Sequence, residues 1–168
     1  SVLWLSYFSK AVTDNLRKEA EQRGIDPPRL VIADNVNKGT HLARHRLADL
    51  FLDTFNFNAH STASDALWAG LPIITKKGEQ FVARCAASML NAVGLTEMIT
   101  KTEKEYEELA LELARNKDCL DSVKLELEYN KESNPFFDTL TYTKNLEKGF
   151  EMAHFQHQTG CCQKDILV

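Results

Sequence analysis

Short apolar segments alternate with stretches of helical periodicity over residues 1–101, and this alternation restricts the possible folds more than any other feature of the chain. The apolar segments are residues 2–8, 30–33, 50–52 and 73–74. Helices are predicted over residues 11–20, 40–48, 61–69 and about 79–93. Alternation of this kind predicts an α/β fold with a Rossmann-like parallel sheet of at least four strands, joined by right-handed crossovers and covered by helices on both faces.

The pattern changes to helices only from Thr102 onward. Apolar stripes predict two helices around residues 106–113 and 120–127, followed by a turn at residues 134–137 and a last helix over residues 139–157. We therefore predict a Rossmann-like lobe over residues 1–101, C-terminal helices over 102–158 that pack on the same lobe, and a tail over 159–168. The chain starts inside an apolar strand, so we expect it to be a fragment of a longer polypeptide.

The composition narrows the class of partner. Hydrophobic residues make up 43% of the 168 residues and the formal net charge is −4, which favours a globular domain over a general binder of nucleic acids or anionic membranes. No apolar run reaches the roughly 20 residues needed to span a bilayer. The four cysteines form neither a CxxC pair nor a disulfide-type spacing, which favours a reducing intracellular compartment.

Basic side chains gather where the second predicted strand leads into its helix. Lys38 precedes that helix, and His41 and Arg44 follow at spacings of three, so all three can share one face. A lysine suits a phosphate or a hydroxyl, an arginine suits the carbonyl groups of a base, and a histidine can stack on a base. Taken alone, the cluster is more typical of a solvated helix surface.

A second junction of the same kind follows the third predicted strand. His60 precedes Ser61 and Thr62, which are predicted to cap the next helix, and Asp65 lies one turn further along. The N-terminus of a helix attracts anions, and hydroxyl groups add donors for a phosphate. An ordinary capping cluster would explain Ser61, Thr62 and Asp65 but not the histidine.

Taken together, these segments carry a resemblance to a known family. Residues 41–54 and 60–72 closely resemble the protein O-GlcNAc transferase family, and so do residues 83–90 and 133–139. The resemblance extends to about Met152. It implies the C-terminal lobe of a GT-B glycosyltransferase fold, the lobe that binds the UDP part of a nucleotide sugar. It also implies that the first strand region of this lobe lies upstream of residue 1.

The resemblance also implies a UDP-binding role for eight residues, which are Val36, Lys38, His41, Arg44, His60, Ser61, Thr62 and Asp65. By analogy, the uracil is addressed by His41, Arg44 and the backbone of Val36. Lys38 and Asp65 would contact the ribose. The remaining three residues would hold the diphosphate at the helix N-terminus.

The implied activity is transfer of N-acetylglucosamine from UDP-GlcNAc to Ser or Thr of proteins by the full-length enzyme. The resemblance implies partners in the same polypeptide, namely an N-terminal catalytic lobe and upstream tetratricopeptide repeats that recruit protein acceptors. It places no catalytic residue in this chain, so we expect the chain alone to transfer no sugar. It implies neither a metal nor another cofactor. The location that it implies is the cytoplasm, or the nucleus as well in a eukaryote.

The chain departs from the family pattern at two places. Asn37, Gly39 and Thr40 flank Lys38 where family members usually have a proline and two glutamates, and Ser61 replaces a threonine. Two alternatives therefore stay open. One is a glycosyltransferase lobe for another donor, such as GDP-fucose or UDP-glucose, and the other is a non-catalytic nucleotide-sugar-binding or scaffold module.

Other motifs carry weaker signals. The tail contains His154, His157, Cys161 and Cys162, but their spacing matches no standard zinc pattern, so we predict no metal site there. Cys85 is predicted to lie in an apolar helix as part of the core. The chain has neither a GxGxxG motif nor a P-loop, which argues against nicotinamide and ATP sites.

Overall fold

The structure is a computed structural model that describes residues 1–160 and 164–168. The chain divides into two compact units, Ser1–His41 and Leu42–Val168. The predicted lobe of residues 1–101 extends over both units, and the predicted helices of residues 102–158 belong to the second. Cys161 and Cys162 lie outside the described residues.

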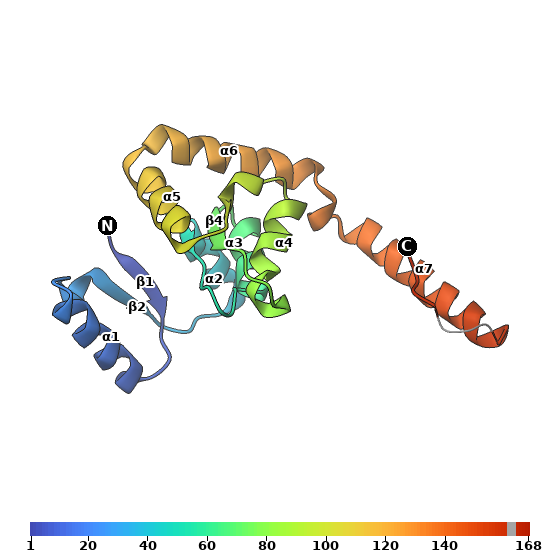
Figure 1. The fold of residues 1–168 in the computed structure, drawn as a ribbon, viewed down its shortest axis with the longest axis horizontal. Helices are drawn as coiled ribbons and strands as arrows, with labels where there is room; N and C mark the ends of the chain where they lie inside the picture. The colour runs from blue at the N-terminus through green and yellow to red at the C-terminus, as the bar shows by residue number, and fades with distance from the viewer. Residues whose placement is uncertain (161–163) are drawn as a thin grey trace. The chain divides into compact units, whose positions relative to one another are not determined.

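The first unit is built on a two-stranded parallel sheet (Figure 1). Strands β1 (Leu3–Ser6) and β2 (Leu30–Ala33) pair in the register Leu3↔Leu30 to Ser6↔Ala33. Between them lie α1 (Lys10–Gln22) and the 3-10 turn η1 (Pro27–Arg29). Ser9 begins α1 as an N-cap, because its side chain accepts a hydrogen bond from the N–H of Val12.

The second unit contains a three-stranded parallel sheet in the order β3-β4-β5. Its strands are β3 (Phe51–Leu52), β4 (Ile73–Lys76) and β5 (Ile99–Thr100). Helices α3 (Ser61–Trp68), α4 (Cys85–Ala92) and α5 (Glu103–Arg115) pack against the central strand β4 (Figure 1). Residues 73–75 of β4 are buried, as a strand covered by helices requires.

The main hydrophobic core lies in this second unit. Its fully buried side chains come from the sheet, from the helices that flank it and from α6 (Lys117–Ser133), and they include Leu67, Ile73, Ile74, Leu90, Leu113 and Leu127. The 3-10 turns η2 (Phe81–Ala83), η3 (Thr96–Met98) and η4 (Pro135–Phe137) connect these elements. Thus α5 and α6 belong to the same core as the sheet.

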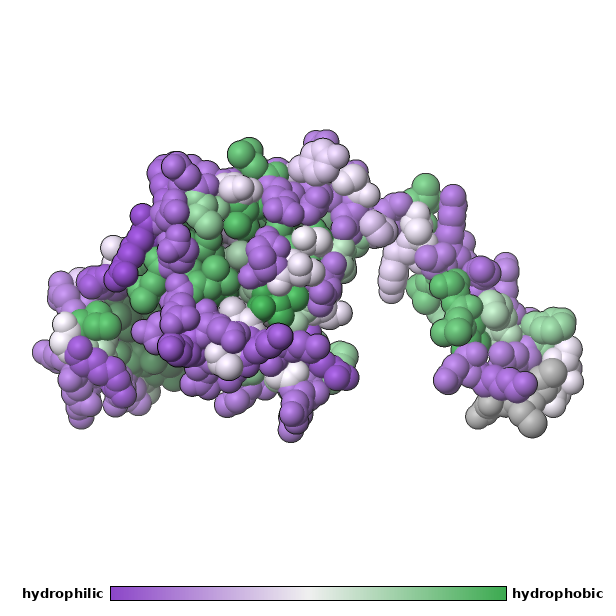
Figure 2. Space-filling view, turned by 45° about the horizontal axis from the view of Figure 1, so that its top comes forward, coloured by the Kyte–Doolittle hydropathy of each residue, from purple (hydrophilic) through white to green (hydrophobic). Residues whose placement is uncertain are grey.

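The last helix, α7 (Thr139–Gln158), contributes no buried residue. Apolar side chains are exposed along it, among them Leu140, Leu146, Phe150 and Phe155 (Figure 2). No helix in the described part of the chain is long and apolar enough to cross a membrane.

The predicted strands are confirmed. Leu3, Val31, Phe51 and Ile73 each lie on a parallel strand, two of them in the sheet of the first unit and two in the sheet of the second. The strand β5 was not predicted. Apolar runs identify strands, whereas the pairing of their edges depends on contacts between distant segments, and a two-residue strand such as β5 has no periodicity to detect.

Two predicted helices have different boundaries in the structure. The helix expected over residues 40–48 is α2 (Lys38–His45), and the one expected from residue 79 is α4, which begins only at Cys85. Residues 77–84 form a loop instead, closed by a hydrogen bond from the N–H of Gly78 to the carbonyl of Ala83 (2.7 Å). Cys85 therefore lies at a helix start, where its thiol donates to the carbonyl of Phe81, and not within the core as predicted.

Gly94 is expected to tolerate no side chain without loss of stability. It has a φ of +81°, and a Cβ there would lie 3.0 Å from Nδ2 of Asn130, which donates to the carbonyl of Val93 (2.9 Å). Gly94→Ala should therefore cost about 1 kcal/mol of left-handed strain and about 1 kcal/mol for the disturbed hydrogen bond. Urea unfolding would measure this, and in an Asn130→Ala background only the strain should remain. An equal cost in both backgrounds would contradict the role of Asn130.

Candidate functional site

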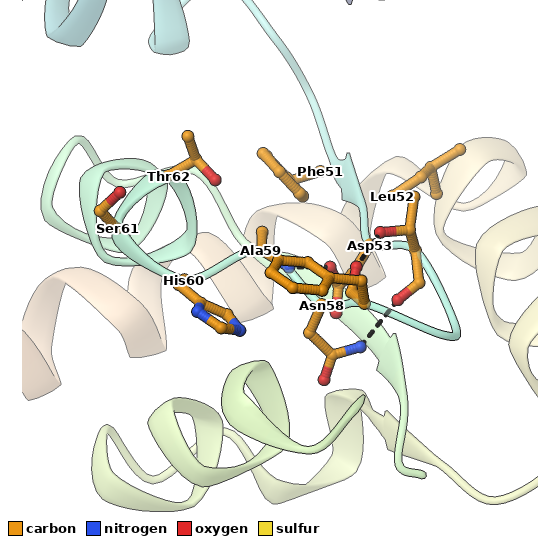
Figure 3. A pocket seen from close by; sticks show the side chains of 10 residues that line it. Phe51, Leu52, Asp53, Asn58, Ala59, His60, Ser61 and Thr62 are labelled. Carbon is orange, nitrogen blue, oxygen red and sulfur yellow. Dashed lines mark hydrogen bonds between the residues drawn. The ribbon is translucent and has the colours of Figure 1, made fainter. Parts of the chain in front are cut away.

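A cavity of about 380 Å³ opens in the second unit where β3 ends and α3 begins (Figure 3). In parallel α/β sheets, the carboxyl ends of strands are the usual place for ligands. The segment of residues 53–60, called the site loop below, forms much of the wall. The cavity is lined by Phe51, Leu52, Asp53, Thr54, Phe57, Asn58, Ala59, His60, Ser61 and Thr62.

The N-terminus of α3 borders this cavity without a side-chain cap. His60 occupies the N-cap position, its side chain makes no capping hydrogen bond, and Ser61 and Thr62 are the first two helical residues. The prediction that Ser61 and Thr62 cap the helix is therefore wrong. Within the described residues, the backbone N–H groups of Ser61 and Thr62 have no hydrogen-bond partner, while those of Ala63 and Ser64 donate to the carbonyl of His60. These two N–H groups and the helix dipole are suited to an anion.

The imidazole of His60 is held between aromatic rings. It stacks on Phe57 with ring centroids 4.8 Å apart and an interplanar angle of 16°. It also makes an edge-to-face contact with Phe81, with ring centroids 6.3 Å apart. Its Nε2 is buried and has no hydrogen-bond partner among the described residues. A buried polar atom without a partner is unfavourable by about 1–3 kcal/mol, so a ligand that pairs with Nε2 would recover that free energy.

Asp53 connects the site loop to β4 through hydrogen bonds. Its carboxylate accepts hydrogen bonds from the N–H of Ala59 (2.7 Å) and the hydroxyl of Thr75 (2.6 Å), and Thr75 is fully buried on β4. The backbone carbonyl of Asp53 accepts from the hydroxyl of Tyr106 on α5 (3.0 Å). Asp53 thus fixes the backbone of Ala59, the residue that immediately precedes His60.

Burial is also the main influence on the pKa values of Asp53 and Tyr106. It raises the pKa of Asp53 above its usual value, against the hydrogen bonds from Thr75 and Ala59, which lower it. Burial, and then the charge of Asp53, raise the pKa of Tyr106, so its hydroxyl remains a donor. Burial thus favours the protonated form of both groups.

Further contacts hold the middle of the site loop. The side-chain amide of Asn58 donates to the carbonyl of Thr54 (2.7 Å), and its backbone N–H donates to the carbonyl of Val82 (2.8 Å). The hydroxyl of Thr54 donates to the carbonyl of Phe57. The loop is therefore held by hydrogen bonds both within itself and to residues 77–84.

The structure places the predicted site residues in three groups. His60, Ser61 and Thr62 line the cavity together, whereas Asp65 lies one turn further along α3 and outside the lining. Lys38, His41 and Arg44 lie on α2 at spacings of three, as predicted. The division between the two units falls after His41, so Val36, Lys38 and His41 belong to the first unit and Arg44 to the second.

Only three of the ten residues that line the cavity were predicted from the sequence, namely His60, Ser61 and Thr62. Asp53, Phe57 and Asn58 are the unpredicted lining residues whose side chains contact the rest of the site. One signal was present for Asp53, because a polar residue directly after a predicted strand lies at the ligand edge of a parallel sheet. Phe57 and Asn58 had no local signal, since their roles depend on contacts to His60 and Val82.

A second cavity of about 400 Å³ is lined by several basic side chains but is poorly suited to an anion. The C-terminal ends of α2 and α3 border it, and the negative end of a helix dipole disfavours an anion there; its lysines come from α6. Two lysines are already paired, Lys124 with Asp49 (3.6 Å) and Lys131 with Glu128 (3.1 Å). In the described part of the chain, no group of three or more His, Cys, Asp or Glu side chains could hold a metal ion.

Comparison with known proteins identifies relatives of the whole chain. A probable UDP-N-acetylglucosamine–peptide N-acetylglucosaminyltransferase, SEC of Arabidopsis thaliana, is 40% identical over 161 residues, covering 95% of this chain and 16% of the relative. The UDP-N-acetylglucosamine–peptide N-acetylglucosaminyltransferase of Caenorhabditis elegans is 35% identical over 147 residues, covering 88% of this chain and 13% of the relative. The chain therefore spans only about a sixth of the length of these relatives.

The fold and the family agree with these relatives. A solved structure of a mutant Thermobaculum terrenum O-GlcNAc transferase superposes with a TM-score of 0.85 at 27% identity, over 95% of this chain and 32% of that one. The α/β fold with parallel sheets flanked by helices is thus that of a GT-B enzyme, as predicted. The sequence model of glycosyl transferase family 41 matches residues 1–146, and the chain therefore belongs to this family.

Proposed function

We propose that this chain is the UDP-binding part of a protein O-GlcNAc transferase, which transfers N-acetylglucosamine from UDP-GlcNAc to Ser or Thr of proteins when the full-length enzyme is present. The proposal is supported by membership of family 41 and by relatives named as peptide N-acetylglucosaminyltransferases. The single observation that carries the binding role is the buried, unpartnered Nε2 of His60 at the uncapped start of α3.

The chemistry of the cavity fits a diphosphate. Two backbone N–H groups and an imidazole nitrogen can donate to phosphate oxygens, and the dipole of α3 adds positive potential. When the glycosidic bond breaks, the departing UDP gains negative charge, which fixed donors stabilise without reorganising. In this proposal the protein donors take the place of a divalent cation, so the reaction needs no metal.

The other assignments extend the same proposal. His41 and Arg44, with the backbone of Val36, address the uracil, and Lys38 and Asp65 address the ribose; these roles are supported by the family resemblance. The partners we propose are an N-terminal catalytic lobe of the same polypeptide and upstream repeats that recruit acceptor proteins. The location that fits such a protein is the cytoplasm, or also the nucleus in a eukaryote.

Titration calorimetry of the full-length protein tests the binding role. UDP and UDP-GlcNAc should bind, whereas GDP and ATP should bind at least about tenfold more weakly, because a purine does not match a site built for uracil. Excess EDTA should leave the affinity for UDP unchanged. Binding of GDP or ATP as tight as that of UDP would contradict the uridine assignment, and loss of UDP binding in EDTA would contradict the metal-free proposal.

A further inference from the structure

Asn58 has a buried acceptor atom that the proposed diphosphate site does not use. The residue lines the cavity and is only 1% exposed. Its side-chain amide and backbone N–H are engaged with Thr54 and Val82, but Oδ1 has no hydrogen-bond partner among the described residues (Figure 3). Such an atom in a ligand cavity indicates a contact that the chain itself does not supply.

The orientation of the Asn58 amide is fixed by its neighbour. If the amide turned over, Oδ1 would face the carbonyl oxygen of Thr54, and two acceptors would oppose each other at about the present 2.7 Å separation. Oδ1 must therefore remain the unpaired atom, and it can only accept. Because the oxygens of an ionised diphosphate also only accept, the partner of Oδ1 has to be a donor, such as a hydroxyl or an amide N–H.

Phe57 is the exposed side chain next to Asn58 in the cavity lining. It directly precedes Asn58 in sequence, and its ring stacks on His60 while 61% of its surface stays exposed. The two unpaired atoms, Oδ1 of Asn58 and Nε2 of His60, are both shielded from solvent. Since Phe57 buries little surface, its ring can turn aside at small cost when a ligand binds.

We propose that Oδ1 of Asn58 accepts a hydrogen bond from a hydroxyl or the acetamido N–H of the transferred sugar. The inference rests on the proposed function, in which His60 holds the diphosphate of the same nucleotide sugar. The sugar is joined directly to that diphosphate, so a residue two positions from His60 is close enough to reach it. Asn58 is thus a sugar-binding residue, and the cavity binds both the diphosphate and the start of the sugar.

Calorimetry on the full-length protein with UDP and UDP-GlcNAc tests this role. Asn58→Ala should weaken UDP-GlcNAc about tenfold more than it weakens UDP, because only the sugar loses a partner. The matched control is Thr54→Ala, which removes the hydrogen bond from Thr54 to Phe57 in the same loop and leaves Asn58 unchanged. It should weaken both ligands by one common factor.

The outcomes separate this inference from the proposal on which it rests. Equal losses for UDP and UDP-GlcNAc in Asn58→Ala would give Asn58 a structural or ribose-binding role and overturn the inference alone. Failure of the unaltered protein to bind either ligand would overturn the proposed function. If Asn58→Ala does not fold, the inference can be tested on the unaltered protein. The affinities of UDP-GlcNAc analogues that each lack one hydrogen-bond donor of the sugar would then be compared. One of them should bind about tenfold more weakly, and uniform binding of all of them would contradict the inference.

Discussion

Asp53→Ala should lower the free energy of unfolding of this chain by about 2–5 kcal/mol. The substitution removes the acceptor for the N–H of Ala59 and for the hydroxyl of the fully buried Thr75, and a buried donor without a partner costs about 1–3 kcal/mol. The cost of burying the carboxylate, which disappears in the variant, offsets part of this loss. Urea unfolding followed by circular dichroism would measure the effect.

Asp53→Asn is the matched control for this prediction. An asparagine has nearly the same shape, accepts from Ala59 through its oxygen and donates to the hydroxyl oxygen of Thr75 through its nitrogen, so it should cost much less. If Asp53→Asn destabilised the chain as much as Asp53→Ala, the shape and hydrogen bonds of the Asp53 side chain would not explain its contribution to the stability of the chain.

The pH dependence of the two proteins gives a second comparison. Because burial raises the pKa of Asp53 in the folded state, its contribution to stability is fully present below the unfolded pKa and is lost as the pH rises through the folded pKa. Asparagine does not titrate. The stability of Asp53→Asn relative to the unaltered chain should therefore improve as the pH rises from about 4, and then become constant.

The fold was largely predictable because its strands and helices have local signals. The buried Ile73 and Ile74 are an apolar pair within β4, and α3 begins and ends within a residue of its predicted limits. Both patterns are read within a few neighbouring residues. The pairing of strands into sheets was not predictable, because it is determined by contacts between segments far apart in the chain.

The candidate site was only partly predictable for the same reason. His60, Ser61 and Thr62 follow one another at a strand-to-helix junction, so a local pattern identified them. The site loop takes its shape from distant partners: Thr75 is 22 residues from Asp53 and Tyr106 is 53 residues from it. No short motif contains such pairs, and the contributions of Asp53 and Asn58 therefore required the structure.

His60→Ala should weaken binding of UDP to the intact protein by about 1–3 kcal/mol, the cost of losing a hydrogen bond to a charged group. Uridine, which has no phosphate, should bind almost as well as before. This difference follows if Nε2, buried and unpaired in the chain itself, donates to the diphosphate. Calorimetry with both ligands would measure it.

The same substitution should leave thermal stability nearly unchanged. His60→Ala loses the stacking on Phe57, worth about 0.5–1.5 kcal/mol, but it also removes the unfavourable burial of an unpaired nitrogen. No capping hydrogen bond is lost, because the side chain of His60 makes none. His60→Phe is the matched control, since it keeps a ring against Phe57 and removes only the nitrogen atoms.

Affinity and stability together distinguish a binding histidine from a structural one. If Nε2 is the phosphate donor, His60→Phe should lose as much UDP affinity as His60→Ala, because the two variants differ in ring contacts but not in the missing donor. If the ring serves mainly to hold the site loop through Phe57, His60→Phe should retain the affinity that His60→Ala loses, and the diphosphate assignment would be wrong. Equal losses of UDP and uridine affinity in either variant would lead to the same conclusion, since uridine offers nothing for a phosphate donor to bind.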